Sequence, residues 1–188
     1  MVHNEKAKTT ALVLTAVCII LSAVHTFTGF PQLPAVGICK DCTILARFAY
    51  PFFHASLLHA LVNCWCLLSL VFYYDVSLCY LLIAYVAAVT FPVGILAAVV
   101  PAASAAGVPT VGLSAVIFAL LGMVSFQAKR KALLHSFVLS SIAFGYLLHV
   151  ICSVCGYAIA APNSTLHLYG YVAGLIVGFL NSPAHVKG

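Results

Sequence analysis

Several polar residues that could carry out acyl-transfer chemistry lie in otherwise apolar stretches of the chain. Ser114 follows Gly112 at the start of one stretch, and His167 lies near the start of another. His59 and Asn63 lie in a third stretch. A serine hydroxyl, an imidazole base and nearby N–H donors are the groups that acyl transfer requires. Strongly polar side chains at bilayer depth are costly, so these residues are candidates for a functional site.

His59 and Asn63 are four residues apart, so on a helix they share one face. Their imidazole and carboxamide N–H groups could then stabilise the negative oxygen of a tetrahedral intermediate. His54 comes five residues before His59, which turns it about 140° away on the same helix at ~100° per residue. We expect His54 to bond to an external loop and to hold the top of the helix. The alternative is that the three polar groups only satisfy one another inside a bundle.

Ser114 is predicted to lie in the first turn of its helix, after Pro109 and Gly112, where backbone N–H groups have no partner within the helix. The Ser114 N–H would then be a third donor to the same oxygen. A Gly-x-Ser sequence is a weak signal by itself, because small residues pack membrane helices together. A purely structural Ser114 is therefore the alternative.

Small residues are predicted to bring the serine and the second histidine together. Three glycines follow His167 on the same helix face: Gly170, Gly174 and Gly178. Three small residues follow Ser114 at a similar spacing: Ala115, Ala119 and Gly122. Such faces allow close approach, so we expect the His167 imidazole to reach the Ser114 hydroxyl, with Phe118 against the imidazole ring. A core histidine without chemistry is the alternative.

No acidic residue is available to complete a Ser-His-Asp triad. Glu5 and Asp75 are predicted to be cytoplasmic, and Asp41 lies in a loop. The expected mechanism is therefore a Ser–His dyad, in which His167 takes the Ser114 proton as general base and returns it to the leaving amine. Packing rather than a carboxylate would orient the imidazole.

The elements that position these residues are predicted to be membrane-spanning helices. The chain has 188 residues, of which 64% are hydrophobic and 6% are charged. Several apolar runs reach the ~20 residues that cross a bilayer. We therefore expect a polytopic integral membrane protein, with one all-α domain over residues 1–188 and no soluble domain. Six spans are predicted, roughly at Ala11–Gly29, Phe52–Tyr74, Ser77–Val100, Val111–Ala128, Ala132–Val154 and Thr165–Asn181.

The first of these spans follows Lys6 and Lys8, as the apolar region of a signal peptide does. At about 19 residues it is longer than the ~7–15 residues of such a region. No convincing cleavage site follows it, so we expect a retained span, with a signal peptide as the alternative.

The net charge of +5 is interpreted as a sign of membrane topology and not of a nucleic-acid partner. Six cations fall on one side of the predicted spans: Lys6, Lys8, Lys129, Arg130, Lys131 and Lys187. Two fall on the other side: Lys40 and Arg47. The positive-inside rule places the larger group, and with it both chain ends, in the cytoplasm. The candidate site residues then lie within about three turns of the external surface.

The chain has eight cysteines. Four lie in predicted spans or at their ends, where cysteine acts as a small apolar residue: Cys18, Cys64, Cys66 and Cys79. Two pairs lie near the external face: Cys39 with Cys42, and Cys152 with Cys155. Their spacing leaves a disulfide or a four-thiol zinc site open, although CxxC alone is a weak signal. We expect no metal and no cofactor.

The three motifs together resemble those of the rhomboid intramembrane serine proteases: His54-x4-His59-x3-Asn63, Gly112-x-Ser114-Ala115 and His167-x2-Gly170-x3-Gly174. The resemblance covers the second to the sixth span. It implies a six-helix bundle with a water-filled cavity open to the external side. It also implies Ser114 as nucleophile, His167 as base, and His59 with Asn63 at the oxyanion hole. The implied substrates are single transmembrane helices, cut near their external end and admitted laterally between spans two and five.

Three features depart from the family pattern. Ala115 replaces a frequent glycine, and Phe118 replaces a frequent tyrosine, which keeps the ring and loses the hydroxyl. The Trp-Arg pair typical of the first external loop is missing, with only Arg47 nearby. None of these changes touches the dyad, so they leave open only loop position and substrate gating.

Two other classes of function stay open. A rhomboid-like protein without catalysis could bind and escort membrane helices, but loss of Ser114 or His167 would be expected there, and both are present. A small transporter or metal-handling protein would carry polar residues across the whole membrane, whereas here they cluster at one depth. The sequence does not identify the substrate, the host membrane or the oligomeric state.

Overall fold

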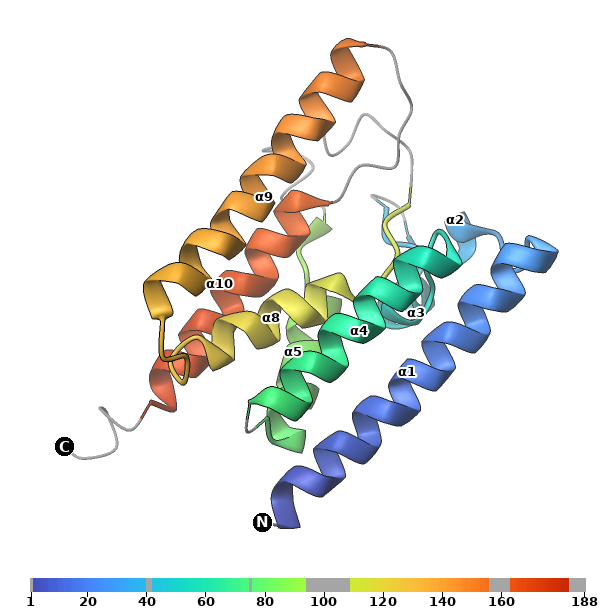
Figure 1. Cartoon of the computed structure of the whole chain (residues 1–188). Helices are drawn as coiled ribbons and strands as arrows, with labels where there is room; N and C mark the ends of the chain where they lie inside the picture. Colours follow the sequence, from blue (N-terminus) through green and yellow to red (C-terminus); the bar gives the residue numbers. More distant parts are fainter. Residues whose placement is uncertain (1, 40–41, 75, 94–108, 156–162, 183–188) are drawn as a thin grey trace.

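The computed structural model describes residues 2–39, 42–74, 76–93, 109–155 and 163–182 (Figure 1). Apart from one β-bridge between Ile38 and Thr110, the regular structure in these residues is helical. The helices are α1 (Val2–Thr28), α2 (Leu33–Val36), α3 (Ile44–Ala49), the 3-10 helix η1 (Tyr50–Phe52), α4 (Leu57–Tyr73), α5 (Leu78–Val89), α8 (Ser114–Val124), α9 (Lys131–Val154) and α10 (Ser164–Leu180). The predicted all-α fold class is confirmed.

Each of the six predicted spans overlaps one of the six longer helices, but the number of crossings stays a prediction. By length and composition, the described residues contain one helix that could cross a bilayer alone, Glu5–Thr28. The bent pair Ile44–Phe52 and Leu57–Tyr73 would be a second span. Four shorter apolar helices follow: Leu78–Val89, Ser114–Val124, Lys131–Leu147 and Ser164–Leu180. The third predicted span continues to Val100, beyond the described residues.

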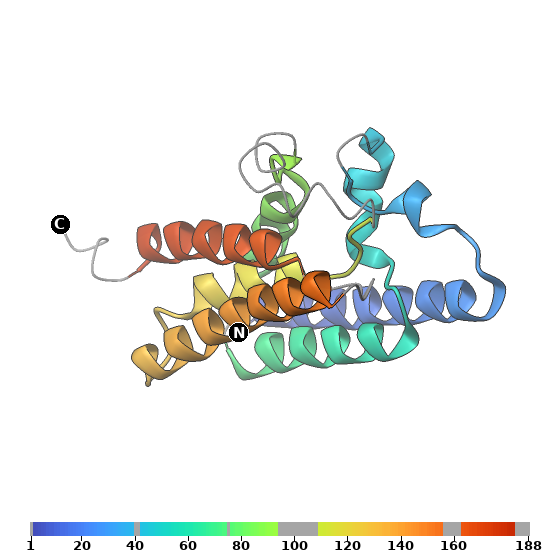
Figure 2. The same cartoon turned by 90° about the horizontal axis from the view of Figure 1, so that it is seen from above.

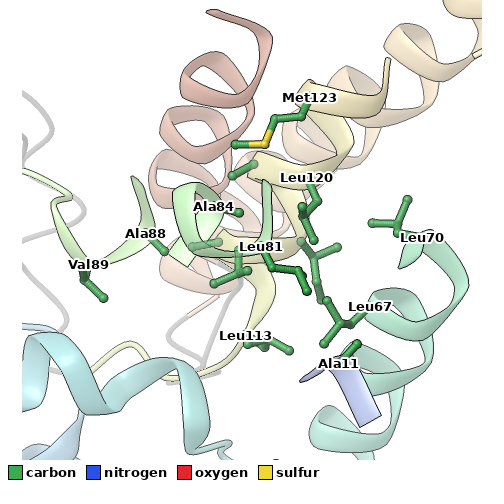
Figure 3. Close-up of a cluster of buried hydrophobic side chains, with 14 of the residues drawn as sticks. Ala11, Leu67, Leu70, Leu81, Ala84, Ala88, Val89, Leu113, Leu120 and Met123 are labelled. Carbon is green, nitrogen blue, oxygen red and sulfur yellow. The ribbon is translucent and has the colours of Figure 1, made fainter. Parts of the chain in front are cut away.

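Helix α8 lies between α10 and α4 in both views (Figures 1 and 2). Eight of its eleven residues are buried, which explains why its sequence is apolar on all sides. Its buried side chains join those of α5, α4 and α1 in one cluster (Figure 3). The labelled members of this cluster are Ala11, Leu67, Leu70, Leu81, Ala84, Ala88, Val89, Leu113, Leu120 and Met123. The first residue of α8 is therefore held by a rigid element.

Helices α8 and α10 touch through their small residues, as the sequence predicts. A Cβ added to Gly170 would lie 2.7 Å from the carbonyl oxygen of Ala115. A Cβ added to Gly174 would overlap the carbonyl group of Ala119, and one added to Gly122 would overlap backbone atoms of α10. Only glycine at these positions lets the two backbones come this close.

Helix α9 packs mainly against α10. Its buried contact is a small cluster of Val138, Ile142 and Tyr171. Two hydrogen bonds add to this contact: His135 Nδ1 with the Tyr171 hydroxyl, and the Tyr146 hydroxyl with the Thr165 hydroxyl. Its large exposed apolar side chains are Leu133, Phe137, Leu139, Phe144, Leu147, Val150, Ile151 and Val154. Of the helices that carry the site or flank it, α9 has the most large apolar side chains exposed among the described residues.

The buried cysteines of α1 and α4 act as small residues with weak donors. Cys18 Sγ donates to the carbonyl oxygen of Pro51 at 3.9 Å, and Cys64 Sγ donates to that of Thr15 at 3.8 Å. Cys39, Cys42 and Cys155 are free thiols. No group of histidine, cysteine or acidic residues in the described ranges could hold a metal ion. Other residues of the sequence predictions lie outside the described residues: Lys40, Asp41, Asp75, Lys187 and the side chain of Cys152.

Candidate active site

Ser114 and His167 meet at the ends of two packed helices. Ser114 is the first residue of α8, and His167 lies in the first turn of α10. The Ser114 Oγ lies 2.8 Å from the His167 Nε2, and both side chains are half-buried. This is the distance over which a hydroxyl can pass a proton to an imidazole.

The ring of Phe118 fixes the plane of the His167 imidazole. The two rings are stacked, with centroids 4.4 Å apart and planes only 6° from parallel. No carboxylate among the described residues shares in this role. Glu5 is the only acidic residue in the described ranges, and it bonds to Lys8 at 2.9 Å on α1. The imidazole is therefore oriented by aromatic packing.

A bridge between the segments that precede α8 and α10 sets the position of the two helix starts. Asn163 caps α10, since its side chain accepts a hydrogen bond from the Leu166 N–H at 3.0 Å. The same side chain donates to the Thr110 hydroxyl at 3.0 Å. Thr110 in turn pairs with Ile38 through two backbone hydrogen bonds. The start of α10 is thereby tied to the chain that leads into Ser114.

Gly112 lies against the side chains of His59 and Asn63. Its φ of +123° is strained for any residue with a side chain. A Cβ at this position would lie 3.0 Å from His59 Cε1 and 3.2 Å from Asn63 Nδ2. The Gly112 N–H is bonded to the carbonyl oxygen of Tyr50 at 3.0 Å, which fixes this turn of the chain. His59 and Asn63 of α4 therefore face the backbone two residues before Ser114.

The Asn63 carboxamide has unused hydrogen-bonding capacity. Its Nδ2 atom is buried and has no hydrogen-bond partner, while the residue as a whole is 7% exposed. Buried donors in folded proteins are nearly always paired, so an unpaired one calls for an explanation. A donor held ready for an oxygen that develops charge during a reaction is one explanation. The Ser114 N–H, in the first turn of α8, has no partner within its helix and adds a second donor.

The prediction that His54 lies on the same helix as His59 is wrong. The chain bends by 79° between the segment that ends at Phe52 and α4. Helix α4 begins only at Leu57, because the Ser56 side chain caps it by accepting from the His59 N–H at 3.2 Å. His54 therefore precedes α4, and its ring meets that of His59 edge to face at 5.0 Å.

His54 links α1 to the segment before α8. It is fully buried, and its Nε2 accepts a hydrogen bond from the Leu113 N–H at 3.3 Å. Because Nε2 is the acceptor, the ring proton must be on Nδ1, which donates to the Ser22 hydroxyl at 3.2 Å. His54 thus holds the backbone next to Ser114, and its expected role of fixing an external loop stays a prediction.

Several residues that support the site were not predicted from the sequence. Ser22 is the partner of His54, and its one sequence signal is a polar side chain within an apolar span. Arg47 was predicted as an external cation and as the nearest cation to a missing motif, but not as a structural donor, and its Nη1 donates to the Phe91 carbonyl oxygen at 3.1 Å. The Tyr50 hydroxyl donates to the Ala88 carbonyl oxygen at 3.0 Å. These bonds attach the first loop to the end of α5.

A family model of the rhomboid domain matches residues 42–184, which is most of the chain. The matched segment contains all of the candidate site residues: His54, His59, Asn63, Gly112, Ser114, Phe118 and His167. No match was found among curated proteins.

Proposed function

The chain belongs to the rhomboid family of integral membrane proteins, whose members are typically intramembrane serine proteases, and from this premise we propose its activity and mechanism. The proposed activity is cleavage of the transmembrane helices of single-pass membrane proteins by a Ser–His dyad. The observation that carries the proposal is the 2.8 Å contact between Ser114 Oγ and His167 Nε2. The whole chain, residues 1–188, is proposed to act as one domain without metal or cofactor.

The proposed reaction has an acylation half and a deacylation half. In the first half, His167 Nε2 takes the Ser114 proton while Oγ attacks the carbonyl carbon of the scissile peptide. The imidazolium then gives this proton to the leaving nitrogen, so the peptide C–N bond breaks and an ester on Ser114 remains. In the second half, water attacks the ester carbonyl and His167 takes a proton from that water. His167 then gives the proton to Ser114 Oγ, which leaves as a free hydroxyl. The products are one new amine and one new carboxylate.

The negative oxygen of each tetrahedral intermediate is proposed to lie between α4 and the start of α8. The Asn63 Nδ2–H and the Ser114 backbone N–H are the proposed donors, with His59 beside them. The unpaired, buried Nδ2 supports this assignment, and so does the absence of a side chain at Gly112. Such preorganised donors act most strongly where water is excluded.

Phe118 is proposed to replace the carboxylate of a triad in two respects. Its stacked ring holds the imidazole in the plane that faces Ser114. The negative face of the aromatic ring also attracts the imidazolium that forms when His167 takes the proton. A dyad without an acidic partner is thereby oriented and electrostatically supported.

The substrate helix is proposed to reach the site laterally, between α4 and α9. Support comes from α9, which packs mainly against α10 and leaves most of its large apolar side chains exposed. Water is proposed to reach Ser114 from the external side, with both chain ends in the cytoplasm.

The test is cleavage of a single-pass transmembrane substrate by the purified protein in detergent. We expect cleavage to disappear in Ser114→Ala and in His167→Ala. A serine-directed phosphonate should label Ser114 in the wild type and fail in His167→Ala, because an unassisted hydroxyl is a poor nucleophile. Ser125→Ala is the matched control, since Ser125 is buried at the other end of α8 and its hydroxyl donates to the Gly122 carbonyl oxygen at 2.7 Å.

Cleavage that survives both substitutions would contradict the dyad. An intact wild-type protein that binds transmembrane helices but cleaves none would favour the escort function instead.

A further inference from the structure

A groove lies at the end of the bundle opposite the Ser114–His167 pair. It has a volume of about 800 Å³ and lies between the end of α4, the α8–α9 connection and the first turns of α9. Its apolar wall is formed mainly by Tyr73, Leu133, Leu134 and Phe137, and two cations line it as well, Lys129 and Arg130. The volume falls within the ~300–1,000 Å³ of sites for small organic ligands.

The two cations of the groove have no acidic partner among the described residues. Lys129 and Arg130 are both exposed. The only ion pair in the described ranges joins Lys8 to Glu5 on α1. Asp75, which follows the groove in sequence, lies outside the described residues. Among the residues that the structure describes, no carboxylate therefore neutralises the positive charge of the groove.

The wall of the groove exposes large apolar side chains directly beside these cations. Tyr73 is 81% exposed, Leu133 62% and Phe137 67%. Such side chains are costly to leave in water, but they suit the acyl chains of a bilayer. A ligand that satisfies both parts of the groove has a negative group and a hydrocarbon tail.

We propose that this groove binds an anionic phospholipid of the surrounding membrane. Its phosphate bonds to Lys129 and Arg130, and the guanidinium group can bind two phosphate oxygens at once. Its acyl chain lies against Leu133 and Phe137. Each cation near a membrane surface strengthens the binding of an anionic lipid by roughly fivefold. The bound lipid would fill the space between the end of α4 and the start of α9.

The test compares the retention of phosphatidylglycerol and phosphatidylcholine with the same acyl chains. The folded wild-type protein is purified in neutral detergent and mixed with both lipids, and the retained lipid is measured by native mass spectrometry. We expect phosphatidylglycerol to be retained preferentially. Lys129→Gln with Arg130→Gln should weaken its binding by on the order of tenfold or more.

Two matched controls test whether lipid retention depends on the residues of the groove or on any charged or apolar residues of the surface. Lys6→Gln with Lys131→Gln removes two cations from the same end of the protein without changing the lining, and should bind like the wild type. Leu133→Gln with Phe137→Gln should weaken retention. Leu139→Gln with Phe144→Gln, which changes exposed residues of α9 outside the groove, should not.

Three results would overturn the proposal: equal retention of the two lipids, equal losses in either control pair, or ready displacement of phosphatidylglycerol by excess inorganic phosphate. The last result would indicate a site for free anions. Size-exclusion chromatography and thermal melting show whether each variant is folded. Lipid retention does not require proteolysis, so this test is independent of the proposed enzymatic activity.

Discussion

At the scale of single residues, Asn63 is the side chain whose surroundings call most clearly for a role in chemistry. Its amide nitrogen is buried, unpaired and 3.2 Å from the place where a Cβ at Gly112 would lie. If it stabilises the oxyanion, Asn63→Ala should lower kcat by up to ~10²–10³-fold with little change in KM. Steady-state kinetics with a transmembrane substrate measures both constants. An unchanged kcat would assign Asn63 to helix packing.

The stacking of Phe118 on the His167 ring should matter for catalysis. Because its ring stacks on His167, Phe118→Leu should lower kcat by roughly 2–30-fold, which corresponds to the ~0.5–2 kcal/mol of a cation–aromatic contact. Phe118→Tyr keeps the ring and is the matched control, with activity expected near that of the wild type. Equal activity of the leucine and tyrosine variants would show that the ring does not orient the base.

His54 should matter for stability rather than for catalysis. Its removal leaves the buried Leu113 N–H without its acceptor, at a cost of roughly 1–3 kcal/mol. We expect His54→Ala to melt several degrees lower than the wild type and to retain some activity. Ser22→Ala should add little in the His54→Ala background, because the two substitutions remove the same hydrogen bond. Additive losses in the double variant would contradict this coupling.

At the scale of elements, the contact between α8 and α10 decides whether the two candidate catalytic residues can meet. A side chain at Gly174 would overlap the Ala119 carbonyl group, so Gly174→Leu should push the helices apart. We expect this variant to insert into the membrane and to lose cleavage and phosphonate labelling. Val172→Leu, at an exposed position of the same helix, is the control and should remain active. Full activity of Gly174→Leu would contradict the packing.

At the scale of the whole molecule, the predicted topology concerns which end of the bundle faces the cytoplasm. The first turn of α1, the start of α9 and the end of α10 lie toward the same end of the bundle (Figure 1). The candidate site lies at the starts of α4, α8 and α10, at the other end. If the cationic segment Lys129–Lys131 is cytoplasmic, a reporter fused after Gly188 should be cytoplasmic, and one inserted near Gly107 should be external. The reverse result for both reporters would invert the topology.

The sequence by itself determined the features that depend on neighbouring residues along one helix. The spacing of His59 and Asn63, and that of Gly170 and Gly174, places each pair on one face because an α-helix has a fixed period. Apolar composition likewise indicated the helices and the membrane, because residues that cannot form a polar surface must face lipid or one another. The rhomboid family could be identified from these local patterns.

Only the tertiary structure decided the contacts between segments distant along the chain. Because the chain bends before α4, His54 lies outside that helix. Its hydroxyl partner is Ser22 of α1, which lies 32 residues earlier in the sequence. The bond between Asn163 and Thr110 and the groove beside Lys129 arise in the same way. Such contacts depend on how the helices pack against one another, which no local spacing specifies. A sequence pattern can therefore name the candidate residues, whereas packing brings Ser114 to 2.8 Å from His167.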